Sequence, residues 1–286
     1  MRDSSILDIA ADASRYAQVA ADRLGLRVVE LTDIAEHHAA ANLLTRVWQA
    51  DSASQVIGAD VIRAFAYSGN YVAGAYLGEA LVGTVMGFQG DGHLHSHIAG
   101  VDPDRWGSGV GYALKQHQRA WALRRGILEV HWTFDPLVSR NAYFNLCKLG
   151  ALPSAYLPDF YGPMTDGINV GDVSDRLYIR WQLDSDRARA AARGEPLGED
   201  TNALRAGGAA VYLDRAGDRP VPAGDLPDKG QLLVAVPLDV EELRPRDPAL
   251  ARTWRFAVRE RLTVALAGGF HIAGISKDGF YLLESA

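Results

Sequence analysis

The sequence predicts an α/β (α+β) protein with one larger domain and a smaller α+β extension at its C-terminal end. Three observations support this prediction. Strand-length apolar stretches recur among amphipathic helical stretches between residues 25 and 183. Within that region, a glycine cluster at residues 107–111 joins an apolar strand to a helix. Regular strand and helix patterns return at residues 230–286, after a stretch rich in Arg, Ala, Gly, Asp and Pro.

Composition and charge exclude several classes of protein. The chain of 286 residues is 48% hydrophobic and 22% charged, which is ordinary for a soluble globular protein. A formal net charge of −6 predicts no surface for nucleic acid. No apolar run reaches the roughly 18 residues of a membrane span, and acidic residues near the N-terminus argue against a signal peptide. The single cysteine, Cys147, can form no internal disulfide, so we expect a cytoplasmic protein.

The first half of the chain alternates between helices and strands. Apolar residues at helical spacing predict an N-terminal helix, and Thr32 or Asp33 can cap the helix that follows the first strand. The turn at residues 77–79 joins two strands into a hairpin. The expected helices are 5–22, 32–48 and 59–67, and the expected strands are 26–31, 71–76, 80–88 and 93–101.

The glycine cluster is the stretch on which the functional prediction depends. It precedes a helix in which Leu114, His117 and Trp121 share one face, and which ends at Gly126. Glycines allow a tight turn with exposed backbone N–H groups, and the helix N-terminus adds partial positive charge, so a phosphate ligand is expected. The G-x-G-x-G spacing is not that of a dinucleotide-binding fingerprint, and no Gly-Lys-Ser/Thr ending makes it a P-loop.

The second half of the chain begins with an apolar strand and a helix that Ser139 can cap. Two extended stretches follow, separated by a polar loop rich in Gly and Asp. Residues 184–229 are predicted as a linker with one short strand at 209–213, and Trp254 lies on an apolar helical stripe expected to be core. The remaining expected elements are 127–134, 139–148, 155–161, 175–183, 231–236, 247–267, 272–275 and 280–283. The predicted domain organisation is an N-terminal helix (1–24), a main domain (25–183), a linker (184–229) and a C-terminal extension (230–286) that packs on the main domain.

Two motifs resemble those of the GNAT superfamily of N-acyltransferases. The sequence VDPDRWGSGVGYAL, residues 101–114, is similar to the acyl-CoA-binding pattern V-x-P-x-x-R/Q-G-x-G-I/V-G-x-A-L, with Trp106 in place of Arg or Gln and Arg105 one position early. The sequence SRNAYFNLCKLGA, residues 139–151, is similar to the second motif, with Leu146 at the position of the tyrosine that many members use as an acid. The combination looks like a less-studied bacterial branch with a C-terminal extension.

This resemblance implies a GNAT-like mixed, mostly antiparallel central sheet flanked by helices, and it implies acetyl-CoA or another acyl-CoA as co-substrate, with no metal. Loop amides would hold the CoA pyrophosphate, and Asn141 is the best match for a contact to the pantetheine arm. The residues expected to bind the cofactor are Val101, Arg105, Trp106, Gly107, Ser108, Gly109, Val110, Gly111, Asn141 and Phe144.

Transfer of an acyl group from a thioester to an amine needs a base for the amine and an acid for the leaving thiolate. We expect His97 or His95 to be the base, because alternate residues of a strand, His93 included, share one face. Structural histidines are the alternative, and metal chelation by this histidine row is a further one that no neighbouring ligand spacing supports. The expected acid is Tyr143, with Tyr156 and Tyr161 as alternatives. The expected substrate contacts are Asp135, Arg140 and Tyr161, with Arg176 as a further carboxylate-binding candidate.

The predicted function is therefore a CoA-dependent N-acyltransferase that moves an acetyl or other short acyl group, succinyl included, to the amine of a small amino-acid-like acceptor by direct attack. One alternative is a non-catalytic CoA-binding regulatory module, and a weaker one is an acyl-CoA lyase or decarboxylase. The expected partner is a small-molecule amine, with neither nucleic acid nor membrane, and the sequence leaves a homodimer open.

Overall fold

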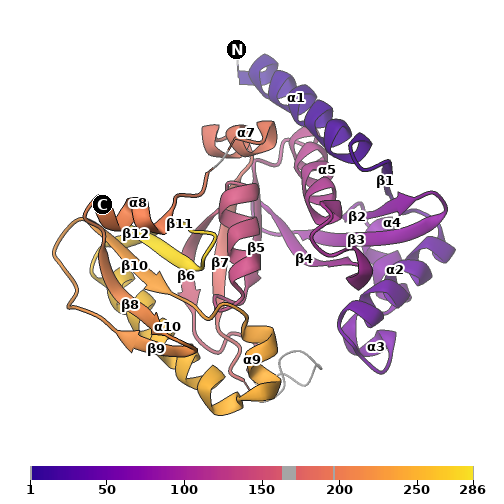
Figure 1. Ribbon diagram of the computed structural model, residues 1–286. Coiled ribbons are helices and arrows are strands. Elements are labelled where there is room, and N and C mark those ends of the chain that lie inside the picture. The colour runs from indigo at the N-terminus through magenta and orange to yellow at the C-terminus, as the bar shows by residue number, and fades with distance from the viewer. Residues whose placement is uncertain (1, 163–171, 196, 286) are drawn as a thin grey trace. The chain divides into compact units, whose positions relative to one another are not determined.

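The computed structural model describes residues 2–162, 172–195 and 197–285, and the chain divides into two compact units (Figure 1). Of the described residues, the first unit contains 2–132 and 182–193. The second unit contains 133–162, 172–181, 194–195 and 197–285. Most of the polar loop expected between residues 161 and 175 lies outside the described residues.

A mixed sheet forms the centre of the first unit. Its strands follow the order β1-β2-β3-β4-β5, in which successive pairs from β1 to β4 are antiparallel and β4–β5 is parallel. The predicted α/β fold class, with a mostly antiparallel sheet, is confirmed. The strands are β1 (Leu26–Glu30), β2 (Tyr71–Leu77), β3 (Ala80–Gln89), β4 (Leu94–Val101) and β5 (Glu129–Phe134), of which the last two residues of β5 belong to the second unit.

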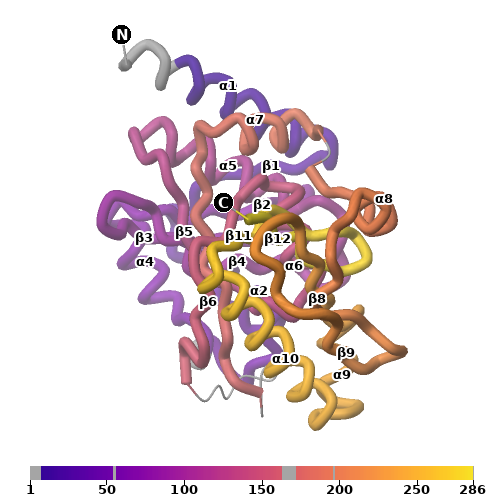
Figure 2. The backbone as a smooth tube through the Cα atoms, turned by 90° about the vertical axis from the view of Figure 1, so that its left-hand side faces the viewer, coloured from indigo at the N-terminus to yellow at the C-terminus, as the bar shows by residue number. Residues whose placement is uncertain are grey.

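Helices cover both faces of this sheet. On one face a Cβ added to Gly83 would lie 2.8 Å from Val110 of α5, so glycine allows the helix to approach closely. On the other face a Cβ added to Gly100 would lie 2.8 Å from Leu44 of α2. Helices α1 and α7 lie beside α5 on its side of the sheet (Figure 2). The helices are α1 (Arg2–Asp22), α2 (Ile34–Val47), α3 (Ala53–Val56), α4 (Ala59–Tyr67), α5 (Val110–Arg124) and α7 (Asp186–Arg193), with a 3₁₀ turn at Pro103–Arg105.

Local sequence explains where these elements begin and end. Asp33 caps α2 by accepting a hydrogen bond from Ala35 N–H, while Glu36 accepts from the backbone N–H of Asp33 at 3.0 Å. This capping box selects Asp33 from the two expected caps. None of the described helices is long and apolar enough to cross a membrane.

The second unit contains a hairpin and a five-stranded sheet. In the hairpin, β6 (Leu152–Leu157) pairs antiparallel with β7 (Arg176–Gln182). The five-stranded sheet has the order β11-β12-β10-β8-β9, and α10 packs against it (Figure 1). Its strands are β8 (Ala210–Ala216), β9 (Arg219–Pro222), β10 (Gln231–Ala235), β11 (Phe270–Ile275) and β12 (Phe280–Ser285). The helices of the unit are α6 (Ser139–Tyr143), α8 (Thr201–Ala206), α9 (Val240–Arg246) and α10 (Pro248–Ala267). Trp254 is fully buried, as its apolar stripe predicts.

Several stretches differ from their sequence prediction: α3 and α9 were not expected, and the strand expected at 155–161 is β6 at Leu152–Leu157. The helix expected at 139–148 is α-helical only to Tyr143 and continues as a π-helix, Phe144–Lys148, a distortion that occurs often at functional sites. The stretch 184–229 contains α7, α8, β8 and β9. Helix α7 is only eight residues long and its buried side consists of alanines among charged residues, which is why the composition resembled a linker. The boundaries of the predicted domains stay a prediction.

Candidate functional site

The glycine loop leads from β4 into α5 through two left-handed residues. Gly107 has φ +76° and Gly109 has φ +99°, a region that other residues rarely adopt. The side chains of the loop bond to its own backbone. Ser108 Oγ donates to Arg105 O at 2.6 Å, and Trp106 Nε1 donates to Val101 O at 2.9 Å. These two hydrogen bonds hold the loop in shape, and nothing lies within 4 Å of a Cβ added at Gly107.

Gly109 is also the N-cap of α5, and no side chain caps this helix within the described residues. The first N–H groups of a helix, here those of Val110, Gly111 and Tyr112, have no partner inside the helix. Together with the helix dipole they form a site suited to an anion such as a phosphate. The cofactor-binding residues predicted from position 101 to position 111 thus gather around one helix N-terminus.

Beside this loop, β4 and β5 diverge. Their parallel ladder contains two residue pairs, Leu94 with Val130 and His95 with His131. The register between β3 and β4 shifts at the same level, because Ser96 pairs with Gly87 while Ile98 pairs with Met86. His97 is therefore the extra residue of a β-bulge, which bends the strand.

The two histidines expected to act as base lie together around one aromatic ring. The centroid of Phe88 is 4.9 Å from that of His95 and 5.7 Å from that of His97, and the two imidazoles are 6.0 Å apart. Burial, reinforced by positive neighbours, lowers the pKa of His95 to about 4, and burial also lowers the pKa of His97. His97 is the more exposed of the two. Both are therefore neutral at pH 7 and can accept a proton.

His93 lies apart from this pair. It precedes β4, and its ring stacks on His131 with centroids 4.0 Å apart. His131 Nε2 is 2.7 Å from Glu129 Oε2. His93 therefore contacts His131, whereas His95 and His97 contact Phe88. Among the described residues, no group of three or more His, Cys, Asp or Glu side chains is arranged to hold a metal ion.

A lysine that the sequence analysis did not select lies at the same level of the sheet. Lys115, on α5, is 6% exposed, and its Nζ donates to Ser96 Oγ at 2.7 Å and to Gln118 Oε1 at 2.9 Å. The nitrogen also lies 4.2 Å from the centre of the Trp132 ring. Burial lowers the pKa of Lys115 to about 7. Nothing in its local sequence distinguishes it from a surface lysine.

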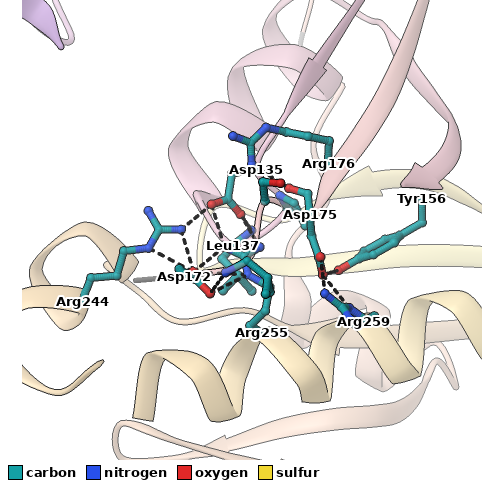
Figure 3. Close-up of polar contacts among 12 residues, drawn as sticks. Asp135, Leu137, Tyr156, Asp172, Asp175, Arg176, Arg244, Arg255 and Arg259 are labelled. Atoms are coloured by element: carbon teal, nitrogen blue, oxygen red, sulfur yellow. Dashed lines mark hydrogen bonds and ion pairs between the residues drawn. The ribbon is translucent and has the colours of Figure 1, made fainter. Parts of the chain in front are cut away.

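In the second unit, Asp135 belongs to a buried network of ion pairs (Figure 3). Arg255 donates to both of its oxygens, at 2.7 and 2.8 Å, and Leu137 N–H donates at 2.9 Å. Arg244 pairs with the same carboxylate, and both arginines also pair with Asp172, at 3.2 Å from Arg244 and 2.8 Å from Arg255. Burial alone would raise the pKa of Asp135, but the arginines hold it well below its usual range.

A second polar group in this unit contains Tyr156. Its hydroxyl donates to Asp175 at 2.6 Å, and Arg259 pairs with the same carboxylate. Burial and the adjacent carboxylate raise the pKa of Tyr156 far above its usual value. This tyrosine is held as a hydrogen-bond donor to a carboxylate.

The substrate-contact candidates Tyr161 and Arg176 lie together near the end of β5. The Tyr161 hydroxyl is 3.1 Å from Thr133 Oγ1, and the Arg176 guanidinium lies over the Tyr161 ring at 5.2 Å. Tyr161 is 49% exposed and can contact a ligand, whereas Arg176 is buried and donates to Asp175 O at 2.8 Å. Arg140, the third candidate, forms an ion pair with Glu241 at 2.8 Å.

The remaining predicted residues lie on the distorted helix of the second unit. Asn141 is exposed on α6, while Tyr143 and Phe144 are partly buried where the π-helix begins. Burial, together with the nearby Cys147, raises the pKa of Tyr143, so its hydroxyl stays protonated at pH 7. Leu146, which stands at the usual tyrosine position, is completely buried.

Four residues of these groups were not predicted from the sequence: Lys115, Asp172, Arg244 and Arg255. One feature could have indicated Arg255: Ala251, Arg255 and Arg259 follow one another at spacing four, directly beside the apolar stripe of Trp254. Arginines at buried helix positions require acidic partners. The sequence offers many aspartates, so it does not identify which ones.

Comparison with known proteins places part of this chain in a family. Residues 37–145 match the family model described as the acetyltransferase (GNAT) family. No curated protein matches the sequence closely enough to count as a relative.

Solved structures with a similar fold include three acetyltransferases. The ribosomal-protein-S18-alanine N-acetyltransferase from Escherichia coli is 13% identical, with 56% of this chain and 95% of that chain covered and a TM-score of 0.46. An N-acetyltransferase from Staphylococcus aureus Mu50 is 11% identical, with 56% and 99% covered and a TM-score of 0.47. An aminoglycoside 6'-N-acetyltransferase complexed with coenzyme A is 15% identical, with 56% and 98% covered and a TM-score of 0.42. Residues 37–145 are therefore similar to the acetyltransferase (GNAT) family.

Proposed function

We propose that this protein is a CoA-dependent N-acyltransferase that moves an acetyl or another short acyl group to the amine of a small acceptor. The observation that carries the proposal is the glycine loop, whose left-handed Gly107 and Gly109 present the bare N-terminus of α5 next to the divergence of β4 and β5. A diphosphate fits this cradle, because backbone N–H groups bind phosphate oxygens and the helix dipole favours negative charge. Acyl-CoA supplies the activated thioester.

His97 is the proposed base. It is exposed, its lowered pKa keeps it neutral at pH 7, and it lies on the bulge of β4. A neutral imidazole can take a proton from an ammonium acceptor, directly or through water. The bulge also leaves backbone groups outside the ladder, which are donors of the kind that polarise a carbonyl oxygen. His95, which is also neutral at pH 7 and whose ring centre lies 6.0 Å from that of His97, is the second candidate for the base.

Tyr143 is the proposed proton donor for the departing sulfur. Its raised pKa keeps the hydroxyl protonated until the thiolate needs the proton. We propose Asn141 and Phe144 as contacts for the pantetheine arm, and Arg140 and Tyr161 as contacts for the acceptor. We also keep Asp135 as a proposed substrate contact, although its ion pairs with two arginines favour a role in shaping the turn after β5.

The acceptor is the least constrained part of the proposal. We favour a small amine with amino-acid character, because arginine and tyrosine side chains are suited to a carboxylate. Proteins of similar fold are named for acceptors as different as an aminoglycoside and a ribosomal protein. An acceptor screen therefore has to include amino acids, aminoglycosides and peptides.

Binding of acyl-CoA tests the cradle. Acetyl-CoA or succinyl-CoA at 100 times its dissociation constant is expected to stabilise the wild-type chain by about 2.7 kcal/mol, which raises its melting midpoint by roughly 5 °C. Gly109→Glu is expected to abolish this shift, because φ +99° disfavours other residues, Leu24 lies 3.2 Å from an added Cβ, and the carboxylate repels phosphate. The measurement is thermal shift with acetyl-CoA, succinyl-CoA and CoA.

Gly78→Glu is the matched control. Gly78 also has a positive φ, at +59°, but it lies in the β2–β3 turn with open space around its Cβ position. The variant is expected to melt lower while keeping the acyl-CoA shift. If Gly109→Glu kept the shift as well, the cradle would not be the binding site. The alternative of a regulatory CoA-binding module is favoured by Leu146, which is buried at the position where the family has tyrosine. Release of free CoA that depends on an added amine would show that the protein is an enzyme and exclude this alternative.

The pH dependence tests the base. The base works when it is neutral, so kcat/KM falls as pH drops through its pKa. Because burial lowers the pKa of His97, the acid limb is expected below pH 6.5, the ordinary histidine value. The measurement is kcat/KM across pH 4.5–8.5 with a primary alkyl amine, which remains an ammonium throughout that range and therefore needs the base. An inflection above pH 6.5 would contradict a desolvated histidine base.

A further inference from the structure

Lys115 is a buried ionisable group that the proposed reaction does not use. It lies in the second turn of α5, and its Nζ donates to Ser96 of β4 at 2.7 Å and to Gln118 of its own helix at 2.9 Å. The same nitrogen lies over the ring of Trp132 of β5, 4.2 Å from its centre. One side chain therefore contacts both strands of the parallel pair.

The contact occurs where the two strands separate. The ladder between β4 and β5 ends at the pair formed by His95 and His131. Ser96 and Trp132 are the next residues on the two strands, and the amine of Lys115 lies between them. Ser96 is in turn flanked by His95 and by His97, the extra residue of the bulge. A displacement of Ser96 would therefore move both imidazoles.

A lysine at this position is costly for folding. Its side chain is 6% exposed, burial lowers its pKa to about 7, and no carboxylate pairs with it in the described part of the chain. Burial of an ionisable group without an opposite charge is unfavourable, and an apolar side chain of the same length would avoid this penalty. The amine, unlike an apolar group, forms a directional hydrogen bond to one specific hydroxyl on β4, that of Ser96.

We infer that Lys115 is a positioning residue, which holds Ser96 at the divergence of β4 and β5 and thereby fixes the orientation of His95 and His97. The expected effect of Lys115 on turnover rests on the proposed function. The effect of the Lys115–Ser96 hydrogen bond on His95 and His97 of β4 can be measured without any substrate.

The test compares Lys115→Met, Ser96→Ala and the double variant in the full-length chain. Methionine is unbranched like lysine and one atom shorter, so it keeps most of the apolar chain but has no donor. We expect Lys115→Met to lower kcat by about 10- to 100-fold, because small displacements of reacting groups have effects of that size. The KM for acyl-CoA should stay within about threefold. The double variant should be no slower than the slower single variant, because both changes break the same hydrogen bond.

A spectroscopic measurement accompanies the kinetics. His95 faces His97, His93, His131 and Lys115, and the positive charge of Lys115 is one of the influences that lower its pKa. In Lys115→Met, NMR titration of the imidazole resonances should show a higher pKa for His95, and the His97 resonances should move. Lys229→Met, which changes an exposed lysine, should leave kcat and both histidines unchanged.

The outcomes separate the inference from the proposed function. If the wild-type chain neither binds acyl-CoA nor releases CoA, the proposed function fails, and the NMR titration still decides whether Lys115 holds the histidine strand. Unchanged histidine resonances in Lys115→Met would overturn the inference in either case. A folded Lys115→Met with wild-type kcat, or additive losses in the double variant, would also overturn it.

Discussion

Arg255→Met is expected to lower the free energy of unfolding by about 3–5 kcal/mol at pH 7, the usual result of removing one partner of a buried ion pair. Arg255 is completely buried and donates to both oxygens of Asp135, while it also pairs with Asp172. Methionine would fill most of the volume but leave two buried carboxylates with Arg244 as their shared cation. The expected loss of stability therefore comes from the missing compensation of the two carboxylate charges and not from lost packing.

Chemical denaturation of the full-length chain is the measurement, and Arg252→Met is its matched control. Arg252 lies on the same helix, three residues before Arg255. It is exposed, and its guanidinium is 5.5 Å from the centre of the Phe256 ring. Its substitution should change the free energy of unfolding by less than about 1 kcal/mol. Equal losses in the two variants would show that the network contributes nothing beyond an ordinary arginine contact.

The pH dependence of the same variants provides an internal check. The pKa of Asp135 is held below its unfolded value, so its contribution to stability is fully present above about pH 4 and is lost as pH falls further. Protonation removes the buried charge that Arg255 compensates. The difference between wild type and Arg255→Met should therefore be largest at pH 7 and become smaller below about pH 4.

His97→Ala is expected to lower kcat by about 10²- to 10⁴-fold, the range for removal of a general base. The variant keeps β4, the bulge and the glycine loop, so binding of acyl-CoA in the thermal-shift measurement should be preserved. The loss should also depend on pH. A free amine needs no base, so the deficit should shrink as pH rises toward the pKa of the acceptor.

His38→Ala is the control for His97→Ala, since His38 is an exposed histidine on α2 of the same unit. It should retain wild-type kcat. If His97→Ala retained it too while His95→Ala lost it, the base would be His95, in spite of its lower pKa. Wild-type turnover in both histidine variants would exclude the histidine pair from the chemistry and leave it as a packed pair around Phe88.

Features that depend on neighbouring residues could be predicted from the amino-acid pattern. Helical and strand periodicity placed the elements of the first unit, because the side that a residue presents follows from its spacing along the chain. Gly107 and Gly109 were identified from the motif alone, and both adopt the left-handed conformation that requires glycine. A family resemblance extended this local pattern to the fold class and to acyl transfer.

Features that join residues distant in the chain depend on the packing of the folded protein and could not be predicted in this way. Arg255 and Asp135 are 120 positions apart, and Lys115 and Ser96 are 19 positions apart on different elements. Nothing local to these residues selects their partners, because a buried charge takes whichever opposite or polar group the packing brings to it. The bulge at His97 likewise depends on the register with β3, which no periodicity within β4 encodes. The sequence therefore determined where the left-handed glycine loop would form, and long-range packing decided which partners the buried charged side chains have.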